Sequence, residues 1–341
     1  GVSTPVQAWK PRISALPYLM PSLSLKDKSE IRTGMDIRYQ PTPELTAVAT
    51  IAPDFATVEG AVEGINFSRS ERYVQDHRPF FLEGQDYFDL GRPYQLGRLF
   101  YPNRIGSMST AFKVYGKTDT KTSLGFLSTF DFGNQSNFIM NYRKEQNASS
   151  GANLMMLQHV EKGADNTVLA AVENYRKGKW GFDSQYLQSL GQGAGGAAWT
   201  TAVNLQDKNL FATLRYKYVA ANFLDTLGYI PFTNFQGISG FVNWSGFWRQ
   251  GYWRGFEIGW LPTWTWDLDG VPFQRNAGLF ATIESRNDNQ YNLFMNGGKY
   301  YNDTDFTYTF EFVRNATNRF RKWGLSFTTG QQASLPYTAY G

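Results

Sequence analysis

Apolar and polar residues alternate along most of the chain, in segments of about 10–14 residues. In residues 209–220, for example, Leu214 and Tyr216 fall on one side of an extended chain, and Arg215 and Lys217 fall on the other. This period of two predicts β-strands with one apolar and one polar face. The segments are longer than the usual strand of about 5–6 residues, and they suit strands that cross a membrane at a tilt.

The alternation predicts an all-β chain, folded as a transmembrane antiparallel β-barrel of about 16–18 strands. We assign strands near residues 11–24, 31–40, 44–52, 107–117, 121–131, 136–144, 152–161, 166–176, 179–188, 197–206, 209–220, 236–249, 252–266, 274–286, 289–299, 304–314 and 319–329. Single-chain bacterial barrels have an even number of strands. We therefore expect sixteen or eighteen, with one of these seventeen segments misassigned or one strand unrecognised near a terminus.

The predicted connections differ in length in a regular way. Tight turns fall at the even-numbered connections, and the long connections, residues 53–106, 189–196, 221–235 and 267–273, fall at odd-numbered ones. In bacterial barrels the short turns are periplasmic and the long loops extracellular. We expect one barrel domain over residues 1–341, with residues 53–106 inserted from the outer rim as a plug or constriction.

Composition favours the same class of protein. Aromatic residues make up 17% and charged residues 18% of the chain, whereas soluble domains are about a quarter charged. No uninterrupted apolar run approaches the ~20 residues of a membrane helix, which excludes a helical membrane protein. The chain has no cysteine, which excludes disulfides, thiol catalysis and cysteine zinc sites. The net charge of +4 is too small to indicate a nucleic-acid partner. The first five residues lack a basic start and an apolar stretch, so we expect the numbering to begin at a processed end.

The loop at residues 53–106 carries an unusual motif. Residues 78–84 place two adjacent phenylalanines between an arginine and a glutamate, with a proline and a glycine that restrict the backbone. Such a loop is expected to fold onto another part of the protein, with Arg78 and Glu83 holding Phe80 and Phe81 against the barrel wall. The residues that we single out in this loop are Asp54, Glu59, Arg78, Pro79, Phe80, Phe81, Glu83, Gly84 and Arg104.

Three motifs follow one another here: residues 53–59, residues 78–84 and residues 99–106. Their order resembles a domain of unknown function that forms an outer-membrane β-barrel in Gram-negative bacteria and usually follows a carbohydrate-binding family-nine-like domain. The resemblance covers about residues 31–106, with a weaker echo at residues 225–229. It departs from the family at Ala52, where an asparagine is usual. The resemblance implies the barrel and the outer membrane, and the family has no established activity.

Acidic residues of the loop admit two interpretations. Asp54, Glu59, Glu63 and Glu83 could form the carboxylate pair of a glycoside hydrolase, which needs two carboxyl groups about 5–9.5 Å apart. Alternatively, they are loop acids paired with arginines. We favour ion pairs and expect no catalytic residue and no enzyme activity.

Metal and sugar sites are also weak interpretations. His77 and His159 are the only histidines, and they are far apart in the sequence, so a transition-metal site is not expected. Asp86 and Asp89 could bind calcium with carbonyl oxygens, but acid-rich turns without calcium are commoner. We predict no metal and no cofactor. The tryptophans between residues 244 and 266 could stack on sugars, but an interfacial girdle is the better interpretation.

If the apolar face meets lipid, the charged residues between the apolar positions line the lumen. The predicted lumen set is Asp36, Arg38, Arg143, Arg215, Lys217, Glu257, Glu284, Arg286 and Glu311. Because the set mixes both signs, it predicts no strong preference for cations or anions.

Two classes of function stay open at this point. One is a porin-like channel or transporter for small solutes, with a lumen constricted by residues 53–106. The other is a non-conducting barrel that serves as a membrane anchor or as a subunit of an outer-membrane assembly. The expected partners are outer-membrane lipid and other outer-membrane or periplasmic proteins. A soluble β-propeller or β-sandwich enzyme is a weaker alternative.

Overall fold

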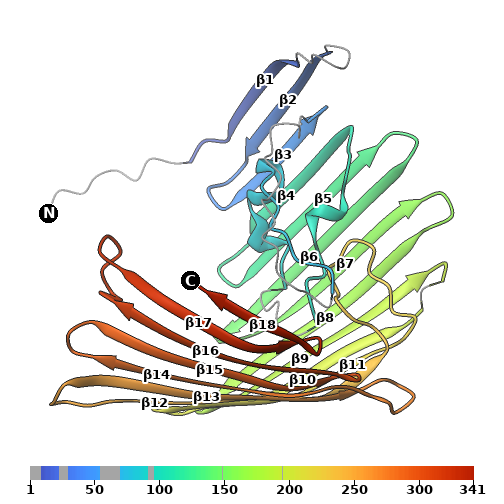
Figure 1. Cartoon of the computed structure of the whole chain (residues 1–341). Coiled ribbons are helices and arrows are strands. Elements are labelled where there is room, and N and C mark those ends of the chain that lie inside the picture. The colour runs from blue at the N-terminus through green and yellow to red at the C-terminus, as the bar shows by residue number, and fades with distance from the viewer. Residues whose placement is uncertain (1–8, 23–29, 54–69, 91–95, 148, 194) are drawn as a thin grey trace, which may run out of the picture. The chain divides into compact units, whose positions relative to one another are not determined.

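Eighteen strands and three short helical turns make up the part of the chain that the structure describes (Figure 1). The structure is a computed structural model, and it describes residues 9–22, 30–53, 70–90, 96–147, 149–193 and 195–341. The strands form one antiparallel sheet. The all-β prediction is confirmed, and the strand number lies at the upper end of the predicted range. The closure of this sheet into a transmembrane barrel stays a prediction.

The strands follow one another along the chain with few interruptions. They are β1 (Arg12–Ser22), β2 (Glu30–Gln40), β3 (Leu45–Ile51), β4 (Thr110–Lys117), β5 (Thr122–Asp131), β6 (Gln135–Asn147), β7 (Ser150–Glu161), β8 (Asn166–Lys177), β9 (Trp180–Gly191), β10 (Ala197–Gln206), β11 (Leu210–Val219), β12 (Phe235–Phe247), β13 (Trp253–Trp266), β14 (Pro272–Ser285), β15 (Asn289–Tyr300), β16 (Asp303–Arg314), β17 (Trp323–Gln332) and β18 (Leu335–Tyr340). The helical turns, α1 (Pro79–Leu82), η1 (Gln85–Tyr87) and η2 (Pro102–Arg104), all lie between β3 and β4. No helix in the described ranges is long and apolar enough to cross a membrane.

The chain divides into two compact units. The first contains Gly1–Glu173, Gln185–Ala197 and Asn222–Pro231, and the second contains Asn174–Ser184, Ala198–Ala221 and Phe232–Gly341. In each unit, the described registers pair strands that are neighbours along the chain.

The strand that the sequence prediction missed is β18, at the C-terminal end. Its turn consists of Ala333 and Ser334, which have backbone φ angles of 51° and 62°. A two-residue hairpin turn with both φ angles positive usually contains asparagine or glycine. Because neither stands here, the sequence carries no turn signal and the last hairpin goes unrecognised.

The connections follow the predicted alternation only in part. Long connections follow the odd-numbered β3 and β11, as predicted, and tight turns follow most even-numbered strands. At the C-terminal end the pattern reverses, because residues 315–322 follow β16, while tight turns follow β15 and β17.

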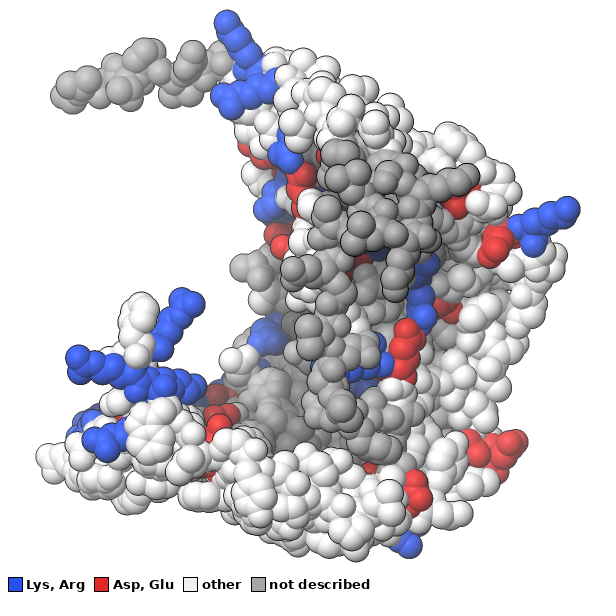
Figure 2. Space-filling model, turned by 45° about the horizontal axis from the view of Figure 1, so that its top comes forward, with Lys and Arg blue, Asp and Glu red and all other residues white. Residues whose placement is uncertain are grey.

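In the second unit the registers separate the two faces of the sheet. Leu214, Gly240 and Ala277 lie on one face, and Arg215 and the charged side chains next to it in the predicted lumen set lie on the other. Leu214 is 63% exposed, which is unusual for a leucine at the middle of a strand. On the face shown in Figure 2, most of the surface over the strands carries neither basic nor acidic side chains.

The first unit departs from the predicted division into one apolar and one polar face. Lys113, Leu127, Ile139 and Leu157 are cross-strand neighbours in one row, and each is at most 1% exposed. Three of these four side chains are apolar, yet the row lies opposite the exposed Met140. This face is therefore partly apolar, and the segment between β3 and β4 contacts it at Lys113, Gly125 and Asn141.

Candidate functional site

The segment between β3 and β4 folds against one face of the first unit (Figure 1). Its described residues, 70–90 and 96–109, include α1, η1 and η2 and bury several of their own side chains, among them Phe81, Phe88 and Ile105. Pro79 begins α1, where the missing amide hydrogen costs nothing, and it favours the extended backbone of the preceding residue. This segment, called the inserted segment below, has its own core.

Arg78 is the centre of the inserted segment. Its Nη2 lies 2.5 Å from Asp76 Oδ2, its Nη1 donates to the carbonyl oxygen of Ile105 at 2.7 Å, and its Nη2 donates to that of Pro102 at 2.6 Å. The guanidinium carbon lies 4.3 Å from the centre of the Phe81 ring. Arg78 and Asp76 are both buried. Arg78 thus joins three parts of the segment to one another, instead of holding the segment to the sheet as the sequence predicted.

Glu83 joins the segment to the sheet, as predicted. Its carboxylate lies 2.6 Å from Arg38 Nη2 on β2, and it accepts a hydrogen bond of 2.5 Å from Tyr115 on β4. Lys113, also on β4, donates to the carbonyl oxygens of Phe80 and Glu83. The buried ammonium group therefore caps the carboxyl end of α1, where a positive charge is favoured.

Two further strands hold the part of the segment that follows α1. On β6, Asn141 donates to the carbonyl oxygen of Tyr87 at 2.8 Å, and Arg143 donates to that of Asp89 at 2.7 Å. On β5, a Cβ atom at Gly125 would lie 2.6 Å from the carbonyl oxygen of Tyr87. The glycine thus lets the backbone of the segment lie directly on the sheet.

The far end of the segment binds residues 222–231, which belong to the same unit. Arg98 and Tyr229 exchange two backbone hydrogen bonds, of 2.9 and 2.7 Å. The amide of Tyr101 donates to the carbonyl oxygen of Leu227 at 2.7 Å, and Arg104 donates to that of Gly228 at 3.1 Å. Residues 225–229, which carry the weak echo of the family motif, therefore form a second docking surface for the segment.

Asp225 is an unusual acid within this docking surface. Both carboxylate oxygens are shielded from solvent and make no hydrogen bond that meets normal geometry among the described residues, although the residue as a whole is only half-buried. Burial raises the pKa of the Asp225 carboxyl to about 8, against the opposing influence of nearby backbone amides and Arg104. The carboxyl group is therefore neutral over most of the acidic range.

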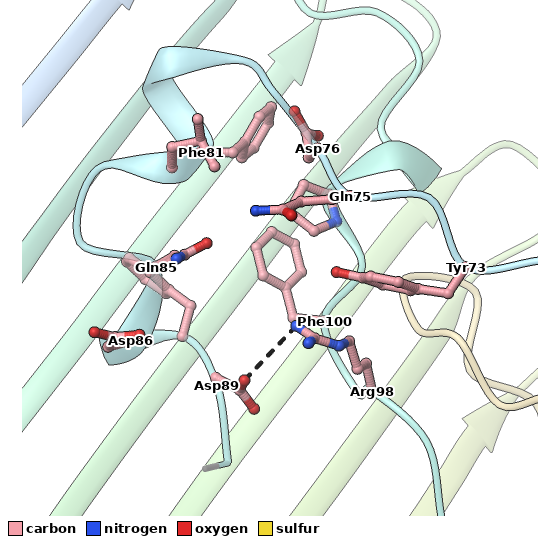
Figure 3. A pocket seen from close by; sticks show the side chains of 12 residues that line it. Tyr73, Gln75, Asp76, Phe81, Gln85, Asp86, Asp89, Arg98 and Phe100 are labelled. Carbon is pink, nitrogen blue, oxygen red and sulfur yellow. Dashed lines mark ion pairs between the residues drawn. The ribbon is translucent and has the colours of Figure 1, made fainter. Parts of the chain in front are cut away.

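A pocket of about 250 Å³ lies within the inserted segment (Figure 3). Both aromatic rings and polar side chains line it. The lining residues are Tyr73, Gln75, Asp76, Phe81, Leu82, Gln85, Asp86, Phe88, Asp89, Arg98, Phe100 and Pro102. Figure 3 shows Gln75, Gln85 and Arg98 around the space that Phe81 and Phe100 border.

The charged groups of the pocket are partly paired. Arg98 lies 3.8 Å from Asp89 and places its guanidinium carbon 4.5 Å from the centre of the Tyr73 ring. Burial raises the pKa of Tyr73, so its hydroxyl stays protonated at neutral pH. With amide, carboxylate, guanidinium and aromatic groups in one space, the pocket offers both donors and acceptors to a small polar solute.

The structure gives the positions of most of the residues singled out in the predicted loop. Arg78, Pro79, Phe80, Phe81, Glu83 and Gly84 come together at α1 and its contacts, and Arg104 lies at the second docking surface. Asp54 and Glu59 lie outside the described residues. Where both partners are described, the arginines pair with acids that we did not assign to them: Arg78 with Asp76, and Arg104 with Glu71.

The predicted lumen set divides by unit. In the first, Arg38 on β2 and Arg143 on β6 bind the inserted segment, and Asp36 lies on the same face of β2 as Arg38, two residues away. In the second, Arg215, Lys217, Glu257, Glu284 and Glu311 lie on one face of the sheet, where the three glutamates bind Asn243, Arg254 and Asn292, respectively. Arg286 lies in the turn after β14, where it donates to the carbonyl oxygens of Gly251 and Trp248, and its place in the lumen stays a prediction.

Several contact residues escaped the sequence prediction. Lys113 carried a usable signal, because a lysine between Phe112 and Val114 in an alternating strand must face away from the apolar side. Asp76 carried none, because it lies in an irregular loop, and Asp225 was marked only by the weak echo at residues 225–229. Among the described residues, no group of three or more histidines and acids could hold a metal ion, and Asp86 and Asp89 remain two pocket acids.

The comparisons with known proteins agree with the motif. Residues 11–130, about a third of the chain, match the model of a family described as a domain of unknown function, DUF5916. A search of curated proteins found no match. The match spans β1 to β5 and the inserted segment, so the family's model covers the sheet strands and the segment that binds them.

Proposed function

We propose that this chain is an outer-membrane β-barrel that acts as a porin-like channel for small solutes, with its lumen constricted by the inserted segment. One observation carries the proposal. A folded segment is bound to one face of amphipathic strands by Arg38, Lys113, Asn141 and Arg143, while the other face exposes large apolar side chains.

The exposed apolar face supports the membrane location. Leu214, Trp264 and Phe310 are each at least 50% exposed, and the same face carries further large apolar side chains on most strands of the second unit. Soluble monomers rarely expose contiguous apolar patches larger than a few hundred Å². Outer-membrane lipid would cover this face and remove the cost of its exposure to water.

The pocket supports the passage of small polar solutes. It has a size of about 250 Å³, and Gln75, Gln85 and Arg98 offer hydrogen bonds beside aromatic rings. The charges around it have both signs, so we expect weak selectivity between cations and anions.

A second function is favoured by how firmly the segment is held. Arg38, Lys113 and Arg143 on the sheet all bind the segment, and Lys113 is buried, so displacing the segment would leave charges and carbonyl groups without partners. A permanently sealed barrel, serving as a membrane anchor or as a subunit that binds an outer-membrane or periplasmic protein, is the alternative.

Conductance in a planar bilayer separates these functions. The amide of Ala52 donates to the carbonyl oxygen of Ser109 at 2.8 Å, so the ends of the insertion are adjacent, and a short Gly-Ser bridge can replace residues 54–107. As a control for the loss of a loop, the same Gly-Ser bridge replaces residues 267–271 in the second unit. For a constricted channel, the parent and the control conduct in small steps and the deletion variant in much larger ones. A silent parent with a conducting deletion variant would indicate a sealed barrel. If the deletion variant enters the bilayer but does not conduct either, the chain is not a channel in any form.

A further inference from the structure

A shallow furrow crosses the exposed face of the second unit. Its floor is formed by small or compact residues on four neighbouring strands: Gly240, Pro262, Ala277 and Gly297. Pro262 pairs with Ala277, which pairs with Gly297, and a Cβ atom at Gly240 would lie 3.2 Å from Pro262 Cγ. The furrow has a volume of about 570 Å³.

The furrow exists because its row of small side chains lies between two rows of large ones. Ile238 and Trp264 are cross-strand partners on one side, and Val242 and Trp260 are partners on the other. All four side chains are exposed. An extended hydrocarbon chain could lie between these rows and restore the contacts that the small floor residues leave unmade.

Two cations stand at the end of the furrow. Arg275 pairs across the strands with Trp264 on one side and with Lys299 on the other, so the three side chains form one row on the exposed face. Arg275 and Lys299 are exposed, and within the described ranges neither side chain makes a hydrogen bond or an ion pair. Both lie close to the strand ends, where a cation on a lipid-facing surface costs about 0–1 kcal/mol.

A second apolar furrow lies on the same face, but it has no cations at its edge. It has a volume of about 520 Å³ and is lined by aromatic and aliphatic side chains, among them Trp244, Phe256, Ile258 and Phe310. No lysine or arginine lines it. Only the first furrow therefore combines an apolar groove with cations that have no partner in the described structure.

We propose that the first furrow binds a phosphate-bearing, acylated lipid of the lipid A type, with the phosphate between Arg275 and Lys299 and an acyl chain along Gly240, Ala277 and Gly297. Two adjacent cations match a phosphate in charge and in hydrogen-bonding capacity. Trp264 is the cross-strand partner of Arg275, and tryptophan prefers the headgroup depth of a membrane. The turn between β13 and β14 lies at the predicted outer rim, which would place the site in the outer leaflet. The inference rests on the proposed membrane location.

Native mass spectrometry of the full chain in a neutral detergent tests the site, with lipid A as the probe. The parent should retain one lipid A, and the double variant R275A/K299A should bind it roughly tenfold more weakly, which corresponds to about 1.4 kcal/mol. A277L, which fills the floor and keeps both charges, should also weaken binding. The matched control R321A/K322A removes two exposed charges from the turn before β17 and should bind as the parent does.

Other outcomes would overturn the site. These are equal retention by the parent and R275A/K299A, equal retention of lipid A and its dephosphorylated form, equal affinity for phosphatidylglycerol, or displacement of the lipid by excess inorganic phosphate. Heat-dependent migration in detergent gels shows whether each variant has folded. Insertion into lipid vesicles is measured separately: a parent that does not insert refutes the membrane location, whereas an inserted parent with unchanged lipid binding in the double variant refutes only the lipid site.

Discussion

Replacing Arg78 by methionine should destabilise the core of the inserted segment, so that the segment opens more often. The side chain of Arg78 is 10% exposed and that of Asp76 is 6% exposed, so the substitution leaves a buried carboxylate without its cation. It also removes the donor from the carbonyl oxygens of Pro102 and Ile105. Removing one partner of a buried ion pair costs about 3–5 kcal/mol.

The magnitude at this site lies near the lower end of that range. The backbone amide of residue 78 still donates to Asp76 Oδ1 at 2.8 Å, so the carboxylate keeps one hydrogen bond after the substitution. We therefore expect a loss of about 3 kcal/mol, which raises the open population of the segment about a hundredfold. Arg78→Lys should lie between the parent and Arg78→Met, because an ammonium restores the charge but cannot bind all three oxygens as a guanidinium does.

Limited proteolysis measures this opening. When the segment opens and closes faster than it is cleaved, the cleavage rate within residues 70–109 follows the open population. The matched control is Glu71→Gln, which breaks the exposed pair between Glu71 and Arg104, with side chains 48% and 37% exposed. An exposed pair contributes about 0–1 kcal/mol, so this rate should rise about fivefold at most. If Arg78→Met is cut as slowly as the parent, or no faster than Glu71→Gln, the central role of Arg78 is wrong.

Three further predictions concern other parts of the chain. Leu214→Arg should reduce refolding in vesicles by about 2–4 kcal/mol if its face meets lipid, whereas Thr213→Arg on the opposite face should lose only its hydrogen bond to the neighbouring strand, about 1 kcal/mol; equal refolding yields would refute the register. The pKa of Asp225 is raised to about 8 in the folded protein and is about 3.9 in an unfolded chain. Its contribution to the free energy of unfolding is therefore fully present below about pH 4 and is lost as the pH rises through 8. Thermal unfolding from pH 4 to 9 should show this loss, and Asp225→Asn should abolish the pH dependence. Gly84→Ala should destabilise α1 by about 1–3 kcal/mol, because residue 84 has a φ of 68° and a Cβ atom would lie 2.6 Å from a tyrosine ring on β4. The control Gly163→Ala, with a φ of 84° and no atom near the added Cβ, measures the backbone part of this cost alone. Equal protease resistance of the two variants would contradict the contact between residue 84 and the tyrosine ring.

Strand positions were predictable because period-two alternation is a local property of the sequence. The run that includes Leu214 and Arg215 gave both the strand and its two faces, and the registers agree with it. The same reasoning failed at Leu127, Ile139 and Leu157, which are apolar on the face expected to be polar. A distant segment covers that face, and a single strand carries no information about what covers it.

The candidate site was predictable only as a motif. Residues 78–84 marked the right place, but the partner of Arg78 turned out to be Asp76, two residues away, and Glu83 reached Arg38 on β2. Which acid pairs with which arginine depends on the path of an irregular loop, and loop paths do not follow from periodicity. Tertiary contact likewise decides the environment of Asp225, whose neighbours Arg98 and Arg104 are far away in sequence.

The hydrogen bond between Ala52 and Ser109 also bears on the order of folding. A hairpin that closes over an insertion of this length costs about 2 kcal/mol more in chain entropy than one with a tight turn. We expect β3 and β4 to pair late, after β4 to β7 have joined through their short turns, and the contacts of the inserted segment to offset the delay by stabilising the finished pair. Pulsed hydrogen exchange during refolding should then protect the amides of β5 and β6 before that of Ala52. The inserted segment would thus dock on strands that are already paired, and the junction between β3 and β4 would be the last part of the first unit to form.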